Sequence, residues 1–565
     1  DNVLGPSRPF FSTYLESMWA LQLCVAIDLL ESANLGGSTS GRVRDRVLAP
    51  SLALIRSYDE GASNRQVWNN AAMIALGALL DDRRTVERAI AGPSGVTSQL
   101  STGLLEDGTW YEGENYHFFA HRGLWYGVTM LDRMGAPLPG ALRERYAEAF
   151  ATPLLTALPD FTFPARRDSQ YGVSLRQWRF AESCELGLTC RDDPRLLGAL
   201  WTLYDQGAIA RRDTGRWRST AEAERNEPAS SLSRADLGWR SLLFARAVLP
   251  PLAPWPARSA LLDGQGIAVL RRDAGRTFVA LDYGHSGGGH GHPDRLNVLL
   301  SHGSDRWLDD LGTGSYVDPS LHWYRSTLAH NAPFANGLSQ GLTDGILRAY
   351  DERGGVGWVD AEVPAGGIAP GVGVRRSLIV MPDYALDQLV WSSDADTQLD
   401  LPLHFDGDVS PPLELRPAEP YRDASSQAAF AFVRDAARAA LDAGAMVAIR
   451  RGDEPVVWIH VSTAAELWRM IGPGAPAHAD RRFHLVRVRG VGGRITAVWN
   501  WGASISRVTA HGDELGIDMR DGSTHVHRAA GDTWHVDFRA NGARSSVDLD
   551  GRRAPRARDA VTSRT

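Results

Sequence analysis

The sequence is notable first for what it lacks. It contains no lysine: all 60 basic residues are arginine, so an arginine in a site cannot be interpreted as a choice over lysine. Three cysteines, an odd and sparse set, predict neither a disulfide framework nor a cysteine zinc site. No apolar run reaches the roughly 18 residues of a membrane-spanning helix, so we expect no membrane insertion. The formal net charge of -7 argues against nucleic acid as a partner.

The beginning of the chain also lacks a basic segment followed by an apolar one, the pattern of a secretory signal. Either no signal peptide existed or it is absent from this numbering. The 565 residues exceed one ordinary core, and 43% hydrophobic with 22% charged residues is typical of globular proteins. Two or three domains are therefore expected.

Hydrophobic periodicity divides the chain in two. Up to about residue 250, apolar residues recur every three to four positions, which predicts helices joined by short turns. The clearest stretches are 11–34, 67–82, 117–135 and 142–158. After a proline-rich linker at 249–259 the period becomes two, in many short runs, which indicates an antiparallel β-sandwich. We predict a helical domain over 1–250, a β-sandwich over 260–550 and a flexible tail over 551–565.

A glycine-rich stretch, "GGGHGHPDRLN" at 287–297, carries two histidines one residue apart. His292 together with Asp310 and His330 forms a histidine, carboxylate, histidine set that suits zinc with one position left open. Asp309 is an alternative carboxylate ligand. On spacing alone, a surface turn with incidental histidines explains the pair equally well.

The sequence blocks around these residues are more specific. "GHGHPDRLNVLL", "DDLGTGSY" and "YRSTLAHN" resemble the β-sandwich signature of heparinase II/III-like polysaccharide lyases. In the helical half, "SNRQVWNNAA" (63–72) and "DGTWYEGENYH" (107–117) resemble the family's catalytic segments. The resemblance spans about residues 60 to 335. It implies an incomplete (α/α) toroid followed by an antiparallel β-sandwich, a secreted or periplasmic bacterial enzyme, and a structural zinc on His292, Asp310 and His330.

A polysaccharide lyase breaks the C4–O bond of a uronate by β-elimination. It must stabilise the developing enediolate, remove the weakly acidic C5 proton and protonate the leaving oxygen. By resemblance, Asn64 and His290 face the uronate, Tyr116 transfers the protons, and Tyr316 is a second tyrosine of the cleft. The alternatives are a helix N-cap for Asn64, core packing for both tyrosines and a turn histidine for His290.

Further residues are expected at the substrate. Many relatives have a histidine after the asparagine, whereas Arg65 stands here; arginine is a poor base but can bind a carboxylate or sulfate. The block "FPARRDSQYGVSLRQWR" (163–179) suits anionic sugars, unless it is a solvated charged loop. The predicted substrate-binding residues are Arg65, Arg167, Gln170, Tyr171, Trp110 and His117. Tryptophan is more often a core residue than a sugar platform.

The leading functional hypothesis is a lyase acting on an acidic polysaccharide, first a glucuronate-containing glycosaminoglycan such as hyaluronan or chondroitin, and second alginate. A glycoside hydrolase would need two carboxylates at a defined separation. Glu112 and Glu114 are the obvious acids for it, but no clear partner is readable. A non-catalytic carbohydrate-binding protein is a third alternative.

Overall fold

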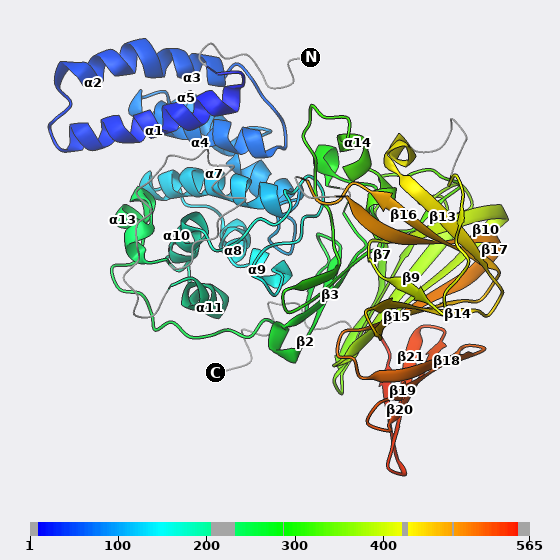
Figure 1. The fold of residues 1–565 in the computed structure, drawn as a ribbon. Coiled ribbons are helices and arrows are strands. Elements are labelled where there is room, and N and C mark those ends of the chain that lie inside the picture. Colours follow the sequence, from blue (N-terminus) through cyan, green and yellow to red (C-terminus); the bar gives the residue numbers. More distant parts are fainter. Residues whose placement is uncertain (1–9, 205–231, 286, 421–427, 477–479, 552–565) are drawn as a thin grey trace. The chain divides into compact units, whose positions relative to one another are not determined.

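In this computed structural model, the described residues are 10–204, 232–285, 287–420, 428–476 and 480–551. The chain divides into two compact units (Figure 1). Unit 1 consists of Asp1–Pro153, Trp178–Leu200 and Leu237–Ala253, and unit 2 of Leu154–Gln177, Trp201–Asp236 and Pro254–Thr565. Apart from residue 551, the predicted tail over 551–565 lies outside the described residues.

Unit 1 is helical. Its α-helices, including two that cross its chain boundaries, are α1 (Thr13–Ser32), α2 (Gly37–Val43), α3 (Ala49–Ile55), α4 (Asn64–Leu79), α5 (Arg83–Ala91), α6 (Val96–Ser98), α7 (Glu114–Arg133), α8 (Gly140–Glu148), α9 (Pro153–Thr156), α10 (Trp178–Gly187), α11 (Pro194–Leu203) and α13 (Trp239–Phe244). Short π-helical turns, η1 (Arg44–Leu48) and η2 (Gln99–Gly103), lie between some of them. The single helix expected over 142–158 is divided into α8 and α9.

Local chemistry explains where the functional helices begin. The Ser63 hydroxyl accepts a hydrogen bond from the Gln66 N–H (3.1 Å) and is the N-cap of α4, so Asn64 is the first helical residue and not the cap. Helix α7 begins after Gly113, whose φ of 102° is strained for any residue with a side chain. Helices α4 and α7 pack closely at Gly123, where an added Cβ would lie 2.8 Å from Val67. Asn64 thus lies in the first turn of α4 and Tyr116 in the first turn of α7, on two helices that pack against each other.

Unit 2 contains three antiparallel sheets. The first has the order β1-β2-β3-β4-β5, a larger one contains β6 to β17, and the last has the order β18-β19-β20-β21-β22. The strands are β1 (Ala260–Leu262), β2 (Ile267–Arg272), β3 (Thr277–Asp282), β4 (Asn297–His302), β5 (Asp305–Leu308), β6 (Phe334–Ala335), β7 (Ile346–Arg353), β8 (Val356–Val363), β9 (Val372–Val380), β10 (Tyr384–Leu403), β11 (Asp408–Ser410), β12 (Arg416–Pro417), β13 (Arg434–Leu441), β14 (Met446–Arg451), β15 (Glu454–Val461), β16 (Ala465–Gly472), β17 (Arg481–Asn500), β18 (Ile505–His511), β19 (Glu514–Met519), β20 (Thr524–Ala530), β21 (Thr533–Ala540) and β22 (Ala543–Leu549).

Side chains that alternate along β2 show how the layers of unit 2 are joined. Ala268 and Leu270 belong to the core shared with the large sheet. Ile267 and Val269, on the opposite face, pack in a second cluster with Leu155 and Leu158. Segment 154–177 therefore contributes to the β unit, although its position in the sequence placed it in the predicted helical domain. A third cluster joins the outer face of β8 to β10 with the C-terminal sheet.

The observed order, helices first and antiparallel sheets second, confirms the fold class predicted from the two periodicities. Among the described residues, no helix has both the length and the apolar character needed to cross a membrane.

Candidate functional site

The predicted site residues divide between the two units. In unit 2, segment 154–177 lies against the histidine loop that joins β3 to β4. The Asp168 N–H donates to the His290 carbonyl oxygen (3.1 Å), and the Thr313 N–H donates to the Ser169 carbonyl oxygen (3.0 Å). Gly287 has a φ of 79°, and an added Cβ there would lie 2.7 Å from the Arg167 side chain. Glycine at this position therefore lets the loop and the segment meet closely.

Two neighbouring arginines anchor this segment. Arg166 is fully buried and donates to Asp282 Oδ2 (2.8 Å) and Gln265 Oε1 (3.0 Å). Arg167 is 1% exposed, and its guanidinium donates to the His285 carbonyl oxygen (2.7 Å). Arg167 was predicted to contact an anionic sugar, but the structure places its side chain in the interior of unit 2.

Asp168 lies at the centre of a cluster that the sequence analysis did not predict. His290 Nδ1 lies 2.8 Å from its Oδ2, and the Tyr316 hydroxyl donates to the same oxygen (3.0 Å). His292 Nε2 lies 3.2 Å from Oδ1, and Arg325 forms an ion pair with the carboxylate. Burial opposes ionisation, yet hydrogen bonds from His290, His292 and Arg325 hold the pKa of Asp168 well below its usual range.

His290 and Tyr316 remain accessible in this arrangement. The His290 side chain is 26% exposed and Tyr316 is 55% exposed, whereas Asp168 is buried beneath them. The Arg325 guanidinium lies over the Tyr316 ring, 5.3 Å from its centroid. The two side chains predicted for the cleft thus share one anchor, and both have surface available for a ligand.

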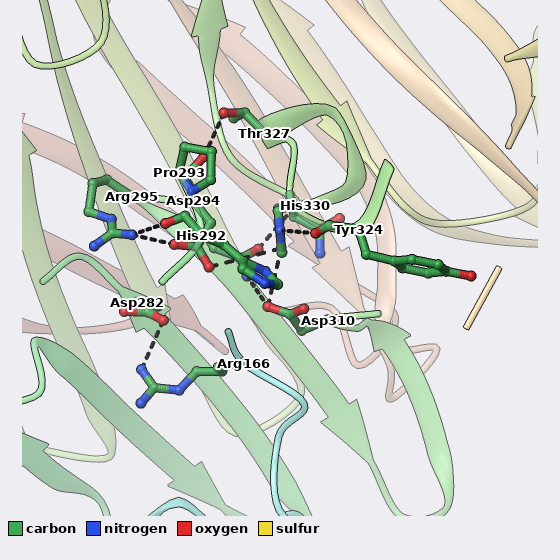
Figure 2. Close-up of polar contacts among 12 residues, drawn as sticks. Arg166, Asp282, His292, Pro293, Asp294, Arg295, Asp310, Tyr324, Thr327 and His330 are labelled. Carbon is green, nitrogen blue, oxygen red and sulfur yellow. Dashed lines mark hydrogen bonds and ion pairs between the residues drawn. The ribbon is translucent and has the colours of Figure 1, made fainter. Parts of the chain in front are cut away.

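Below this cluster lies the candidate metal centre. His292, Asp294 and His330 are buried, and one potential ligand atom from each lies within 4.8 Å of the other two. Among the described residues, His292 Nδ1 and Asp294 Oδ2 are buried without a hydrogen-bond partner, as expected for atoms that bind a cation. Figure 2 shows the rings of His292 and His330 beside the Asp310 carboxylate.

The predicted carboxylate ligand, Asp310, has a second carboxylate nearby. Its Oδ2 lies 3.2 Å from His330 Nδ1, and Asp294 Oδ2 lies 4.0 Å from the same nitrogen. Although burial alone would lower it, these carboxylates raise the pKa of His330 to about 9. The pocket therefore favours a positive charge, and two imidazoles with carboxylate oxygens fit the preferences of a zinc ion. Sequence spacing did not single out Asp294.

Asp309, the alternative ligand, has other partners. Its Oδ2 accepts from the Tyr171 hydroxyl (2.6 Å) and from Arg306 (3.3 Å). Arg306 also lies over the Tyr171 ring, 5.0 Å from its centroid. Tyr171 and Gln170 are partly exposed. Tyr171, predicted to bind substrate, thus has its hydroxyl bonded to a carboxylate of its own unit.

In unit 1, the Asn64 amide is held by a buried network. Its Nδ2 donates to Glu112 Oε2 (2.8 Å), which also accepts from the Trp110 indole N–H (2.6 Å). Trp110 is fully buried, so it does not present a face for stacking on a sugar, contrary to the prediction. Glu112, one of the two acids considered for a hydrolase, is 5% exposed and serves here as an acceptor. Glu114 is 6% exposed.

Tyr116 lies in the first turn of α7 and is partly exposed. Its neighbour His117 is buried: its Nδ1 accepts from the Trp110 backbone N–H (3.0 Å), and its Nε2 lies 2.8 Å from the Ala149 carbonyl oxygen. Burial lowers the pKa of His117 to about 4. With both ring nitrogens bonded inside the unit, His117 is a structural histidine and not the substrate contact that we expected.

Arg65 follows Asn64 on α4 and forms an ion pair with Glu60 (2.8 Å). The Arg65 side chain is 26% exposed and that of Glu60 is 3% exposed. Glu60 therefore balances part of the positive charge of Arg65 that was expected to bind a uronate or sulfate.

Comparison with known proteins agrees with the resemblance. Residues 255–467 match the family described as heparinase II/III-like, C-terminal. An alginate lyase from Stenotrophomonas maltophilia is 25% identical over 453 residues, which cover 72% of this chain and 56% of the relative. An exo-oligoalginate lyase from Saccharophagus degradans is 27% identical over 216 residues, 32% of this chain and 29% of the relative. The chain thus matches little more than half the length of the first relative and less of the second.

Solved structures show the same fold. A heparinase III crystal structure superposes with a TM-score of 0.60 at 13% identity, covering 94% of this chain and 75% of that one. The heparan sulfate lyase HepC from Pedobacter heparinus gives a TM-score of 0.57 at 12% identity, covering 90% of this chain and 69% of that one. Residues 255–467 thus match the heparinase II/III-like C-terminal family, as the resemblance predicts, and the chain has the fold of heparinase III.

Proposed function

We propose that this protein is a polysaccharide lyase that cleaves uronate-containing chains by β-elimination and leaves 4,5-unsaturated uronate ends. One observation carries the proposal. The heparinase II/III-like domain holds His290, which is partly exposed, and Tyr316, which is exposed, on a single buried carboxylate. This arrangement suits an acidic sugar, because it presents an imidazole and a phenol close together on a rigid base.

Unit 1 would supply the remaining groups. Asn64, oriented by Glu112, would donate to the uronate carboxylate as its charge grows, and Tyr116 would take the C5 proton and return a proton to the leaving O4. The buried, hydrogen-bonded state of Glu112 counts against its use as the acid of a hydrolase. A secreted or periplasmic location would suit a polymeric substrate.

A bound zinc ion would neutralise the carboxylates beside His292 and His330. It would thereby hold the histidine loop in place. His292 and His330 would hold it with Asp310, as the resemblance implies, and Asp294 is close enough to contribute. Neither the C5 proton nor the leaving oxygen needs a metal-bound group in this scheme, because Tyr116 moves both.

For the substrate, we propose a glucuronate-containing glycosaminoglycan such as hyaluronan or chondroitin. Arg65 cannot act as a second base. This favours a uronate substrate whose C5 proton and C4 oxygen lie on the same side of the ring. Alginate is the second candidate, and a specific observation favours it: both sequence relatives described above are named as lyases of alginate or its oligomers.

A substrate panel tests the proposal. The protein is incubated with hyaluronan, chondroitin, heparan sulfate and alginate, and the ultraviolet absorbance of unsaturated uronate is followed, with Tyr116→Phe as the control. A rise on one polymer with the wild type alone is expected. New reducing ends without absorbance would instead indicate a hydrolase, and binding without any cleavage would indicate a carbohydrate-binding protein.

A further inference from the structure

Within the part of the chain that the structure describes, the side-chain partners of Asp168 all belong to the candidate site. Its partners are His290, His292, Tyr316 and Arg325. Arg166 and Arg167, which precede Asp168, also hold segment 154–177 in place through their buried contacts. The segment thus has buried anchors besides the carboxylate, and the four contacts of Asp168 all go to residues of the candidate site.

Hydrogen-bond chemistry assigns the protons in this cluster. An ionised carboxylate only accepts, so each imidazole nitrogen that faces it must carry a hydrogen. His292 therefore has its proton on Nε2, which leaves Nδ1 with a free lone pair. That same Nδ1 is the buried atom without a hydrogen-bond partner among the described residues. By the same argument, His290 has a proton on Nδ1, which faces Asp168 Oδ2.

The geometry points to Asp168 as a positioning residue that serves both halves of the site. Through Oδ1 it fixes the tautomer of His292 that can bind a metal ion; through Oδ2 it fixes the orientation of His290 and Tyr316 toward the sugar. This inference rests on the proposed function for its second half only. Arg325 forms an ion pair with the same buried carboxylate.

The first test reads the tautomers in the wild-type protein. Long-range ¹H–¹⁵N spectra of histidine-labelled protein distinguish Nδ1–H from Nε2–H, and His290→Gln and His292→Gln assign the two signals. We expect Nε2–H for His292 and Nδ1–H for His290. The opposite tautomer for either residue overturns the inference, whether or not the protein is active.

The second test changes the carboxylate. Asp168→Asn replaces one acceptor oxygen with an N–H donor, which opposes a histidine N–H and forces a tautomer change or a rotation. Groups that orient metal-binding histidines typically account for roughly 10–100-fold in metal affinity or activity. Zn²⁺ affinity, measured against a chromogenic chelator, should fall by about this factor, and kcat should fall while KM stays within a few-fold.

Asp160→Asn is the matched control. Asp160 lies on the same segment and pairs with Arg306 (3.0 Å), outside the cluster, so zinc affinity and kcat should be unchanged. Equal zinc affinity and equal kcat in Asp168→Asn and wild type would refute the inference. If no uronate polymer is cleaved by the wild type, the proposed function fails, yet zinc affinity and the tautomers still decide the role of Asp168.

Discussion

Asn64 Nδ2 donates to Glu112 Oε2 over 2.8 Å, and this contact fixes the direction in which the amide can act. Glu112→Gln should weaken the orientation of Asn64 and lower kcat, whereas Asn64→Ala should remove the donor altogether. The second loss should be about 3 kcal/mol of transition-state stabilisation, as for an oxyanion-hole amide. Steady-state kinetics of both variants check this, with the exposed Glu106→Gln as the control. An Asn64→Ala enzyme within a few-fold of wild type would remove Asn64 from the mechanism.

Tyr116→Phe should retain the fold and nearly abolish turnover, because only the hydroxyl that carries the proton is removed. General acid–base catalysis contributes about 10²–10⁴-fold, and a group that serves both proton transfers should lie at the upper end. Initial rates and thermal unfolding of Tyr116→Phe are compared with those of Tyr58→Phe, a partly exposed tyrosine of the same unit. Turnover near that of Tyr58→Phe would show that another group moves the protons.

Metal analysis of the purified protein should find close to one equivalent of a zinc-type ion. His330→Ala should lose the ion together with thermal stability, and a chelator should destabilise the wild type but not this variant. A ligand at about 1,000 times its Kd stabilises the folded state by about 4 kcal/mol. Alanine variants of Asp294, Asp309 and Asp310 then identify the carboxylate, since only the true ligand abolishes binding. A metal-free wild type as stable as His330→Ala would rule the site out.

Unit 1 should lose stability in acid because of His117 and His121. Burial lowers the pKa of His117 to about 4 and that of His121 to about 3. Both lie below the unfolded value of about 6.5. The stabilisation is therefore complete above pH 6.5 and is lost as the pH falls toward 4, because the unfolded chain takes up the protons.

Each of these histidines should contribute at most about 1.4 kcal/mol per pH unit to the slope of unfolding free energy between pH 6 and 4. Urea denaturation at several pH values measures this slope. It should become shallower by that amount in His117→Gln and stay unchanged in His322→Gln, which alters an exposed histidine. Parallel slopes for wild type and His117→Gln would contradict the expected linkage.

Chondroitin should be cut faster than dermatan, and mannuronate blocks of alginate faster than guluronate blocks. In glucuronate the C5 proton and the C4 oxygen leave from the same side, so Tyr116 alone suffices, whereas the C5 epimers need a base on the other face. Arginine is a poor base, Arg65 pairs with Glu60, and both nitrogens of His117 are engaged. Equal or faster cutting of dermatan would mean that a second base exists, and His290→Ala would be the next variant.

The order of the fold was readable from the sequence because helices and strands impose different hydrophobic periods. The histidines of the candidate metal centre were also predictable, since His292 and His330 lie in distinctive blocks. Asp168 and Asp294 were not. Asp168 is separated by more than 120 positions from the histidines it contacts. Periodicity says nothing about such pairs.

The arginines of the same region have a different role from the one expected. The block that contains Arg166 and Arg167 was expected to suit anionic sugars, yet both arginines make internal contacts that hold the segment in place. Trp110 and His117 were assigned to the substrate from their position beside Tyr116. His117 follows Tyr116 in the first turn of α7, where adjacent residues point in different directions, and its side chain is buried. Trp110 precedes the helix and is also buried.

The interrupted course of the chain limits how this protein can be divided or recombined. The backbone passes between the two units at five places, after Pro153, Gln177, Leu200, Asp236 and Ala253. A fragment that ends at residue 253 would carry segment 154–177 with Asp168 but none of the strands that bury it. The helical unit is therefore not a transferable cassette, and homologous recombination should be tolerated only where both units are exchanged together.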